Sequence, residues 1–268
     1  MKACLISIGN ELLSGKTVNT NANFLAKKLT SFGFVIQKIL TIPDDPLIVP
    51  KEISLLVSSG QYRLILITGG LGPTWDDSTA IFLAKALGVN TELNSEALSI
   101  VTKRYNDLFD KGLVDTAEIT SARKKMAILP VGSEVIDNPV GTAPGIFFIH
   151  KPSNTWIFCL PGVPREMKEM YNVIQVKISD LKNETQIGYY ETEFTSTFTD
   201  ESLLAPFLIQ VRQEYDVWIK SLPEAYQEEK NIHLIISKSA GSKEVAKNEV
   251  LAAKAYLHKL IISSGHDK

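Results

Sequence analysis

Short apolar runs that alternate with helical patterns constrain the fold of this chain more than any other feature. The runs are Ala3–Ile8, Phe34–Ile42 and Leu64–Ile67. The third is apolar at every position, which is typical of a strand buried on both faces of a parallel sheet. Each run is followed by apolar residues at helical spacing, and the helices that follow the first and third runs stop at Gly33 and Gly88. This order predicts an α/β domain with a doubly wound, mainly parallel sheet in three layers, which we place at residues 1–180.

The pattern changes after about residue 183, and a smaller domain is predicted there. Its expected elements are a strand, a helix, two strands and a helix, at Tyr189–Phe198, Glu201–Tyr215, Val217–Ser221, Ile232–Ser237 and Lys243–Leu260. The last helix is amphipathic, with apolar residues on one side and lysines and glutamates on the other. We therefore predict a small second α+β domain over residues 186–268.

Composition excludes several classes of function. The 268 residues are 44% hydrophobic and 22% charged with a net charge of −2, so no basic stripe suited to nucleic acid dominates. No apolar stretch reaches membrane-spanning length. The cysteines Cys4 and Cys159 are too few for a disulfide framework, which favours a reducing compartment. We expect a cytoplasmic protein that binds neither nucleic acid nor membrane.

Unusual residues follow several of the predicted strands. Gly9-Asn10-Glu11 follows the first strand, Asp44-Asp45 the second and the segment TGGLGPTWDDST, Thr68–Thr79, the third. Pro161-Gly162 follows a later apolar run. Parallel sheets bind ligands at the carboxyl ends of their strands. If the later strand is also parallel, these segments converge on one rim of the sheet.

The chemistry of these residue types suggests a phosphorylated ligand. Gly69, Gly70 and Gly72 allow close approach of the backbone, the following helix offers free N–H groups, and Thr74 adds a hydroxyl donor. Carboxylates beside a phosphate repel it unless they hold a divalent cation or position a water. Mg²⁺ is typically bound by one or two carboxylates together with phosphate oxygens of the substrate. The pattern therefore predicts a metal-assisted site.

Simpler explanations of the same residues stay open at this stage. Asp76 or Asp77 could cap the following helix, and Asp44-Asp45 after Pro43 makes a favourable helix start. The turn is neither a Walker A loop, since no Gly-Lys-Ser/Thr follows, nor the dinucleotide fingerprint, whose spacing it lacks. The second domain has no GxxG loop, so the KH mode of RNA clamping is unsupported.

Five motifs together resemble the CinA-like family, the competence/damage-inducible group whose N-terminal domain is similar to molybdopterin-binding domains. They are GNELLSGKTVNTN from Gly9, PDD from Pro43, TGGLGPTWDDST from Thr68, GTAPG from Gly141 and LPGVPREM from Leu160. They occur in the family's order over roughly the first 170 residues. The remainder, including FTDES, is similar to the KH-like middle domain of longer members. We expect a stand-alone form without their nicotinamide-nucleotide amidase domain.

The resemblance implies hydrolysis of ADP-ribose to AMP and ribose 5-phosphate with a divalent metal, Mg²⁺, Mn²⁺ or Co²⁺. Related proteins of molybdenum-cofactor synthesis bind molybdopterin and adenylate it, and they share the GG-x-G…D-x-T and LPG-x-P patterns. The LGPT-DD form favours the CinA side. Molybdopterin binding or adenylylation is thus one alternative, and a non-catalytic nucleotide sensor or scaffold is another.

The resemblance also assigns roles to residues. Asp77 is expected to be the main catalytic carboxylate, with Asp44 second. One departure is Asn10, where many relatives have Asp. The expected metal ligands are Glu11, Asp45 and Asp76, and the expected ligand contacts are Gly69, Gly70, Gly72, Thr74, Asn21, Thr142 and Gly162. The expected partners are a small nucleotide substrate and further copies of the chain, as a homodimer or higher homo-oligomer.

Overall fold

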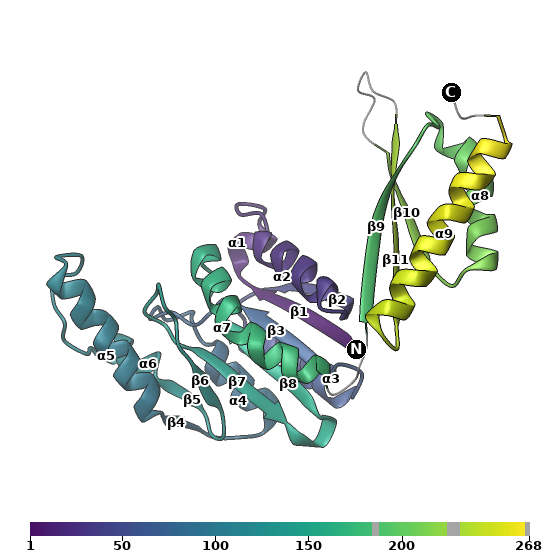
Figure 1. The fold of residues 1–268 in the computed structure, drawn as a ribbon. Helices are drawn as coiled ribbons and strands as arrows, with labels where there is room; N and C mark the ends of the chain where they lie inside the picture. The colour runs from purple at the N-terminus through teal and green to yellow at the C-terminus, as the bar shows by residue number, and fades with distance from the viewer. Residues whose placement is uncertain (184–187, 224–230, 266–268) are drawn as a thin grey trace. The chain divides into compact units, whose positions relative to one another are not determined.

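A computed structural model describes residues 1–183, 188–223 and 231–265 of the chain (Figure 1). Two compact units divide it. Unit 1 comprises Met1–Leu29 and Val35–Asp180, and unit 2 comprises Thr30–Phe34 and Leu181–Lys268. The predicted start of the second domain, residue 186, lies outside the described residues.

Unit 1 is built on a six-stranded sheet in the order β2-β1-β3-β8-β7-β6. Strands β2, β1, β3 and β8 run parallel, whereas β7 is antiparallel to β8 and β6 is antiparallel to β7. The strand bounds are β1 Lys2–Ile8, β2 Val35–Ile42, β3 Leu64–Thr68, β6 Glu134–Ile136, β7 Gly145–His150 and β8 Thr155–Leu160. The prediction of a mainly parallel α/β sheet is therefore confirmed.

Helices cover both faces of this sheet, which explains why β3 is buried at all five positions (Figure 1). Cys4 and Ile6 of β1 pack in one apolar cluster with Ile53 of α3 and Leu83 of α4. Alternate strand residues point to the opposite face, where α2 and α7 lie. Phe24 of α2 contacts Tyr171 of α7 edge to face at 5.6 Å between ring centroids. The helix bounds are α1 Asn10–Leu13, α2 Thr20–Ser31, α3 Ile48–Ser58, α4 Thr79–Leu87 and α7 Pro164–Asn183.

Residues 94–125 have a polar, helical pattern in the sequence, and this segment is less continuous in the structure than that pattern predicts. It forms two helices, α5 Ser95–Asp110 and α6 Ser121–Lys125, separated by residues 111–120. These helices are flanked by β4 Thr91–Leu93 and β5 Ile128–Pro130, which pair antiparallel. Strands of three residues are too short to show a two-residue period, so the sequence did not indicate β4, β5 or β6. The apolar runs Gly145–Ile149 and Trp156–Leu160 predict two neighbouring strands, which are found as β7 and β8, joined by the short helix η1 Lys151–Ser153.

Unit 2 has the predicted order of strand, helix, two strands and helix. Its antiparallel sheet has the order β10-β11-β9, and α8 and α9 supply Leu204 and Leu257 to a cluster with Leu234 and Ile236 of β11. The bounds are β9 Gly188–Ser196, α8 Glu201–Glu214, β10 Trp218–Pro223, β11 Ile232–Ala240 and α9 Lys243–Ser263. Across the described residues, none of the helices has the length and apolar character needed to cross a membrane.

Candidate active site

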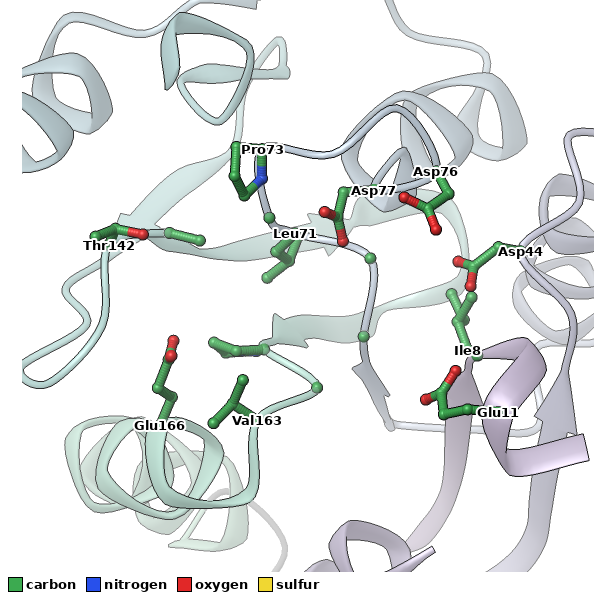
Figure 2. A pocket seen from close by; sticks show the side chains of 17 residues that line it. Ile8, Glu11, Asp44, Leu71, Pro73, Asp76, Asp77, Thr142, Val163 and Glu166 are labelled. Atoms are coloured by element: carbon green, nitrogen blue, oxygen red, sulfur yellow. The ribbon is translucent and has the colours of Figure 1, made fainter. Parts of the chain in front are cut away.

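A cavity of about 390 Å³ lies at the carboxyl ends of the parallel strands of unit 1 (Figure 2). Its wall comes from the segments that follow β1, β2, β3 and β8, together with the loop before β7. The predicted convergence of these strand ends is therefore observed. The lining residues are Ile8, Gly9, Glu11, Asp44, Gly69, Gly70, Leu71, Gly72, Pro73, Asp76, Asp77, Thr142, Ala143, Pro161, Gly162, Val163 and Glu166.

The Gly-rich turn after β3 is held closely against neighbouring strand ends. Gly69 has φ +103°, and a Cβ atom there would lie 2.2 Å from the carbonyl oxygen of Ile8. Only glycine fits both this conformation and this contact. The N–H of Gly69 donates to the Leu160 carbonyl at 3.0 Å, and the Thr79 hydroxyl donates to the Gly69 carbonyl at 2.8 Å. The turn thus joins β1, β8 and α4 at the floor of the cavity.

Asp77 is fixed by hydrogen bonds from within its own loop. Its Oδ2 accepts from the Thr74 N–H at 2.9 Å and from the Thr74 hydroxyl at 2.6 Å. Asp76 also lies within reach of that hydroxyl, which lowers the pKa of Asp76. The N-cap of α4 is Ser78, and no side chain caps it. Neither aspartate therefore serves as the helix cap that the sequence left open.

Asp44 has the least compensated carboxylate of the group. Its Oδ1 is buried and has no hydrogen-bond partner. Burial raises the pKa of Asp44 to about 6, and the charges of Asp76, Glu11 and Asp77 add to this effect. Figure 2 shows these carboxylates facing one another on one side of the cavity.

Asp45 does not line the cavity with its neighbour. Its Oδ1 accepts from the N–H groups of Leu47 at 2.8 Å and Ile48 at 2.9 Å, at the start of α3. These hydrogen bonds lower the pKa of Asp45, and the bond from Ile48 has the larger effect. The structure therefore places Oδ1 of Asp45 at the start of α3 and the residue outside the lining of the cavity, and its role as a metal ligand stays a prediction.

The residues predicted to contact the ligand form two groups, those that line the cavity and those that hold the lining residues in place. Gly69, Gly70, Gly72, Thr142 and Gly162 line the cavity. Two others stand behind the wall. Thr74 holds the aspartates, and Asn21 of α2 donates from Nδ2 to the Gly162 carbonyl at 2.8 Å.

Two charged residues at the site were not predicted from the sequence. Glu166 lines the cavity and its Oε2 accepts a hydrogen bond from Asn138 Nδ2 at 2.8 Å. Lys125 of α6 donates to the carbonyl of Asp77 at 2.7 Å and also to that of Thr74. Glu166 stands inside the LPGVPREM motif, which could have indicated it, whereas no local pattern indicates Lys125.

The cavity wall is acidic. Glu11, Asp44, Asp76, Asp77 and Glu166 line it, and no Lys, Arg or His is found among the lining residues that the structure describes. Within the same described part of the chain, no three Asp, Glu, His or Cys side chains are arranged to hold a metal ion by themselves. The buried, unpartnered Oδ1 of Asp44 is a hard oxygen donor of the kind that Mg²⁺ and Mn²⁺ prefer. The residues therefore fit a cation whose remaining ligands come from a bound phosphate.

An α/β fold with its site at this rim defines a known class, and comparison with known proteins identifies it. The chain belongs to the family described as "probable molybdopterin binding domain", whose model matches residues 4–179. It is 33% identical to the protein CinA, of unknown function, from Thermoplasma acidophilum, whose crystal structure matches with a TM-score of 0.59 over 66% of this chain and 99% of that one. The expected CinA-like character is confirmed.

Relatives also match over nearly the whole chain. A protein of Saccharolobus islandicus is 38% identical over 270 residues, covering 97% of this chain and 97% of its own. A protein of Saccharolobus solfataricus is 41% identical over 224 residues, covering 83% of this chain and 78% of its own. The similarity to the Saccharolobus islandicus protein thus extends beyond the family domain into unit 2.

Proposed function

We propose that this protein hydrolyses the diphosphate of ADP-ribose to AMP and ribose 5-phosphate with the help of a divalent cation. The observation that carries the proposal is the acidic cavity itself, with the buried, unpartnered Oδ1 of Asp44 beside a Gly-rich turn. The CinA-like character of the chain supports the choice of substrate.

The charge of the cavity explains why a cation is required. A diphosphate that approached Glu11, Asp44, Asp76 and Asp77 alone would be repelled, because no basic side chain is among the described residues of the wall. Asp44, with Glu11 and Asp76 around it, would hold the cation. When bound, the cation would neutralise phosphate charge and lower the pKa of a water molecule.

The residues of the chain then have separate tasks. Gly70 and Gly72 bring the backbone to the diphosphate, and Asp77, fixed by Thr74, orients the attacking water and accepts its proton. The water oxygen bonds to one phosphorus as the bond from that phosphorus to the bridging oxygen breaks. One water is consumed, the two monophosphates form, and no oxidation occurs.

A product assay tests the proposal. Purified protein is incubated with ADP-ribose and Mg²⁺, Mn²⁺ or Co²⁺ in turn, and AMP and ribose 5-phosphate are quantified. Both products are expected to form in equal amounts only with a cation. Asp77→Ala is expected to lower turnover at least about a hundredfold, a typical effect of losing a positioned acid–base group. Asp44→Asn is expected to lower turnover as well, because it weakens the binding of the cation that neutralises the phosphate charge.

The neighbouring aspartate provides the matched control. Asp45→Asn makes the same chemical change one residue away, where the carboxylate serves α3, and is expected to keep turnover within about threefold of the wild type, since no positioned acid–base group is lost. Absence of both products with every cation, from folded protein, would overturn the proposal. Saturable ADP-ribose binding without turnover would instead support a nucleotide sensor.

The family description favours one alternative, which is molybdopterin binding or adenylylation. The same acidic cavity and Gly-rich turn would suit a pterin phosphate that binds together with a cation. Pterin fluorescence that co-purifies with the protein, in a preparation that does not cleave ADP-ribose, would decide for this alternative.

A further inference from the structure

Glu166 lies apart from the other acidic residues of the cavity. Figure 2 shows it on the same side of the cavity as Thr142, across from Asp44 and Glu11. The charges that raise the pKa of Asp44 are those of Asp76, Glu11 and Asp77. The cavity therefore has two ends, and we call the one formed by Glu166 and Thr142 the Glu166 end.

A fully buried amide fixes the orientation of the Glu166 carboxylate. Asn138 is 0% exposed, and its Oδ1 accepts from the N–H of Gly141 at 2.8 Å and from that of Val140 at 3.3 Å. These bonds place Oδ1 toward the backbone, so Nδ2 must face the carboxylate. Nδ2 donates to Glu166 Oε2 at 2.8 Å and to the Ala143 carbonyl at 2.9 Å. Both Oδ1 and Nδ2 of Asn138 thus make two hydrogen bonds each, which hold Glu166 and the loop that contacts it.

The loop approaches Glu166 more closely than a side chain would allow. A Cβ atom at Gly141 would lie 2.0 Å from Glu166 Oε2 and 2.5 Å from Asn138 Nδ2. The backbone therefore closes over one carboxylate oxygen, while the side chain as a whole is half-buried and lines the cavity. The carboxylate is held as a preorganised acceptor for a ligand.

The charge of Glu166 determines which part of a ligand can lie there. A phosphate would be repelled, and the proposed cation belongs to the opposite end. A neutral group that donates hydrogen bonds is favoured, because a donor paired with a carboxylate forms a charge-assisted bond. The sugar of a nucleotide carries adjacent hydroxyl groups, and acidic side chains bind ribose hydroxyls in this way in dinucleotide sites.

We propose that Glu166, positioned by Asn138, accepts hydrogen bonds from ribose hydroxyl groups of the ligand and selects ribose over deoxyribose. This inference rests on the proposed function for the identity of the ligand, because it assumes a sugar phosphate in the cavity. It adds a specificity-determining residue at the end of the cavity opposite the carboxylates that surround the diphosphate.

Binding of the two product halves tests the inference without requiring turnover. Calorimetry in the presence of Mg²⁺ measures Kd for AMP against 2′-deoxy-AMP, and for ribose 5-phosphate against 2-deoxyribose 5-phosphate. In the wild type, one of the two pairs is expected to show about a tenfold to hundredfold preference for the ribose form, the range of a charge-assisted hydrogen bond. The pair that shows it identifies which sugar occupies the Glu166 end.

Variants of Glu166 test whether this residue causes the preference for ribose. In Glu166→Gln the side-chain oxygen is expected to keep the Asn138 bond and turn an N–H₂ group to the cavity, so the preference should fall below about threefold. Glu166→Asp keeps the charge but withdraws the oxygens, and should lower the preference as well. Glu169→Gln, an exposed position one turn along α7, is the matched control and should keep the wild-type ratio.

The outcomes separate this inference from the proposed function. Asp77→Ala should abolish turnover and leave the ribose preference unchanged. The inference is overturned if the wild type shows no preference for ribose in either pair. It is also overturned if the preference persists in both Glu166 variants. Either result counts whether or not ADP-ribose is cleaved. A ribose preference that depends on Glu166, in a protein without turnover, would uphold the sugar site and reject only the hydrolase.

Discussion

Asp44 and Asp45 are neighbours in the sequence with opposite environments. Asp45 Oδ1 accepts two backbone N–H groups at the start of α3, which stabilise its charged form. Asp44 turns into the cavity, where Oδ1 has no partner and three other carboxylates surround it. A difference of one residue therefore separates a structural carboxylate from one whose charge is costly in the folded protein.

This cost predicts how stability depends on pH. The pKa of Asp44 is raised from 3.8 to about 6 by burial, so the folded state binds the proton more tightly than the unfolded state. The contribution of Asp44 to stability should therefore fall as pH rises from about 4 through about 6 and then stay level. Asp44→Asn removes this loss and should be more stable than the wild type by about 1 kcal/mol at neutral pH, after discounting for solvent screening of a partly exposed group.

Denaturant unfolding at about pH 4 and about pH 8 measures this effect. The advantage of Asp44→Asn should be close to zero at the lower pH and complete at the higher one, and Mg²⁺ together with AMP should reduce it. An advantage of equal size at both pH values would mean that it does not come from the charge.

Sequence patterns placed these carboxylates on one rim but could not assign their roles. The strand-end rule depends only on the direction of the strands, and it held for the ends of β1, β2, β3 and β8. The roles depend on which way each side chain turns, which is set by turns such as the one from Thr74 to Asp77. The sequence therefore did not separate Asp45, which serves the start of α3, from Asp44, which lines the cavity. It did not indicate the contact of Glu166 with Asn138 either, because the two residues lie 28 positions apart in the chain.

At the scale of elements, the short helix α6 supports the loop that carries Asp76 and Asp77. Lys125 at its end donates to the carbonyls of Thr74 and Asp77, about 50 residues earlier in the chain. Burial lowers the pKa of Lys125, whereas the nearby charges of Asp77 and Asp76 favour its protonated form. The loop is therefore held from outside the sheet as well as by Thr74.

Removing this support should impair the site more than the fold. Lys125→Met is expected to lower kcat/KM for ADP-ribose about tenfold, because loss of the charge-assisted hydrogen bonds frees the backbone around Asp77. The same substitution is expected to lower the free energy of unfolding by about 1–2 kcal/mol. Lys124→Met, at the exposed neighbouring position, is the control for loss of charge. Equal losses in the two variants would show that general charge, rather than the bonds to the loop, is responsible.

The sequence predicted the long elements of the chain and missed the short ones. Runs such as Leu64–Ile67 and the helix after Glu201 show clear periodicity, and both are found within a few residues of their predicted ends. The strands β4, β5 and β6 have three residues each and depend on partners elsewhere in the chain. The helical pattern over residues 94–125 also did not show its interruption between α5 and α6.

At the scale of the whole molecule, the two units have separate apolar cores. The cluster of unit 2 includes Leu234 and Leu257, both 0% exposed, whereas every residue that lines the candidate site belongs to unit 1. The free cysteines Cys4 and Cys159 are both buried in the core of unit 1, which raises the pKa of each thiol. The chemistry proposed for the site is therefore assigned to residues of unit 1.

A core substitution in unit 2 tests this division. Leu257→Ala should destabilise unit 2 by about 2–5 kcal/mol, as expected when a buried leucine leaves a cavity. Turnover of ADP-ribose at a temperature where the variant is still folded should match that of the wild type. A loss of turnover without unfolding, followed by circular dichroism, would mean that unit 2 contributes to catalysis.

The parallel pairing of β3 has a consequence for the unfolded chain. Thr68 pairs with Leu160 at the carboxyl ends of β3 and β8, and the cavity beyond these ends takes residues from Ile8 to Glu166. No continuous stretch of the chain holds enough of these residues to bind a nucleotide. The unfolded chain should therefore have no affinity for the ligand. Ligand binding should then raise the free energy of unfolding by the full free energy of binding.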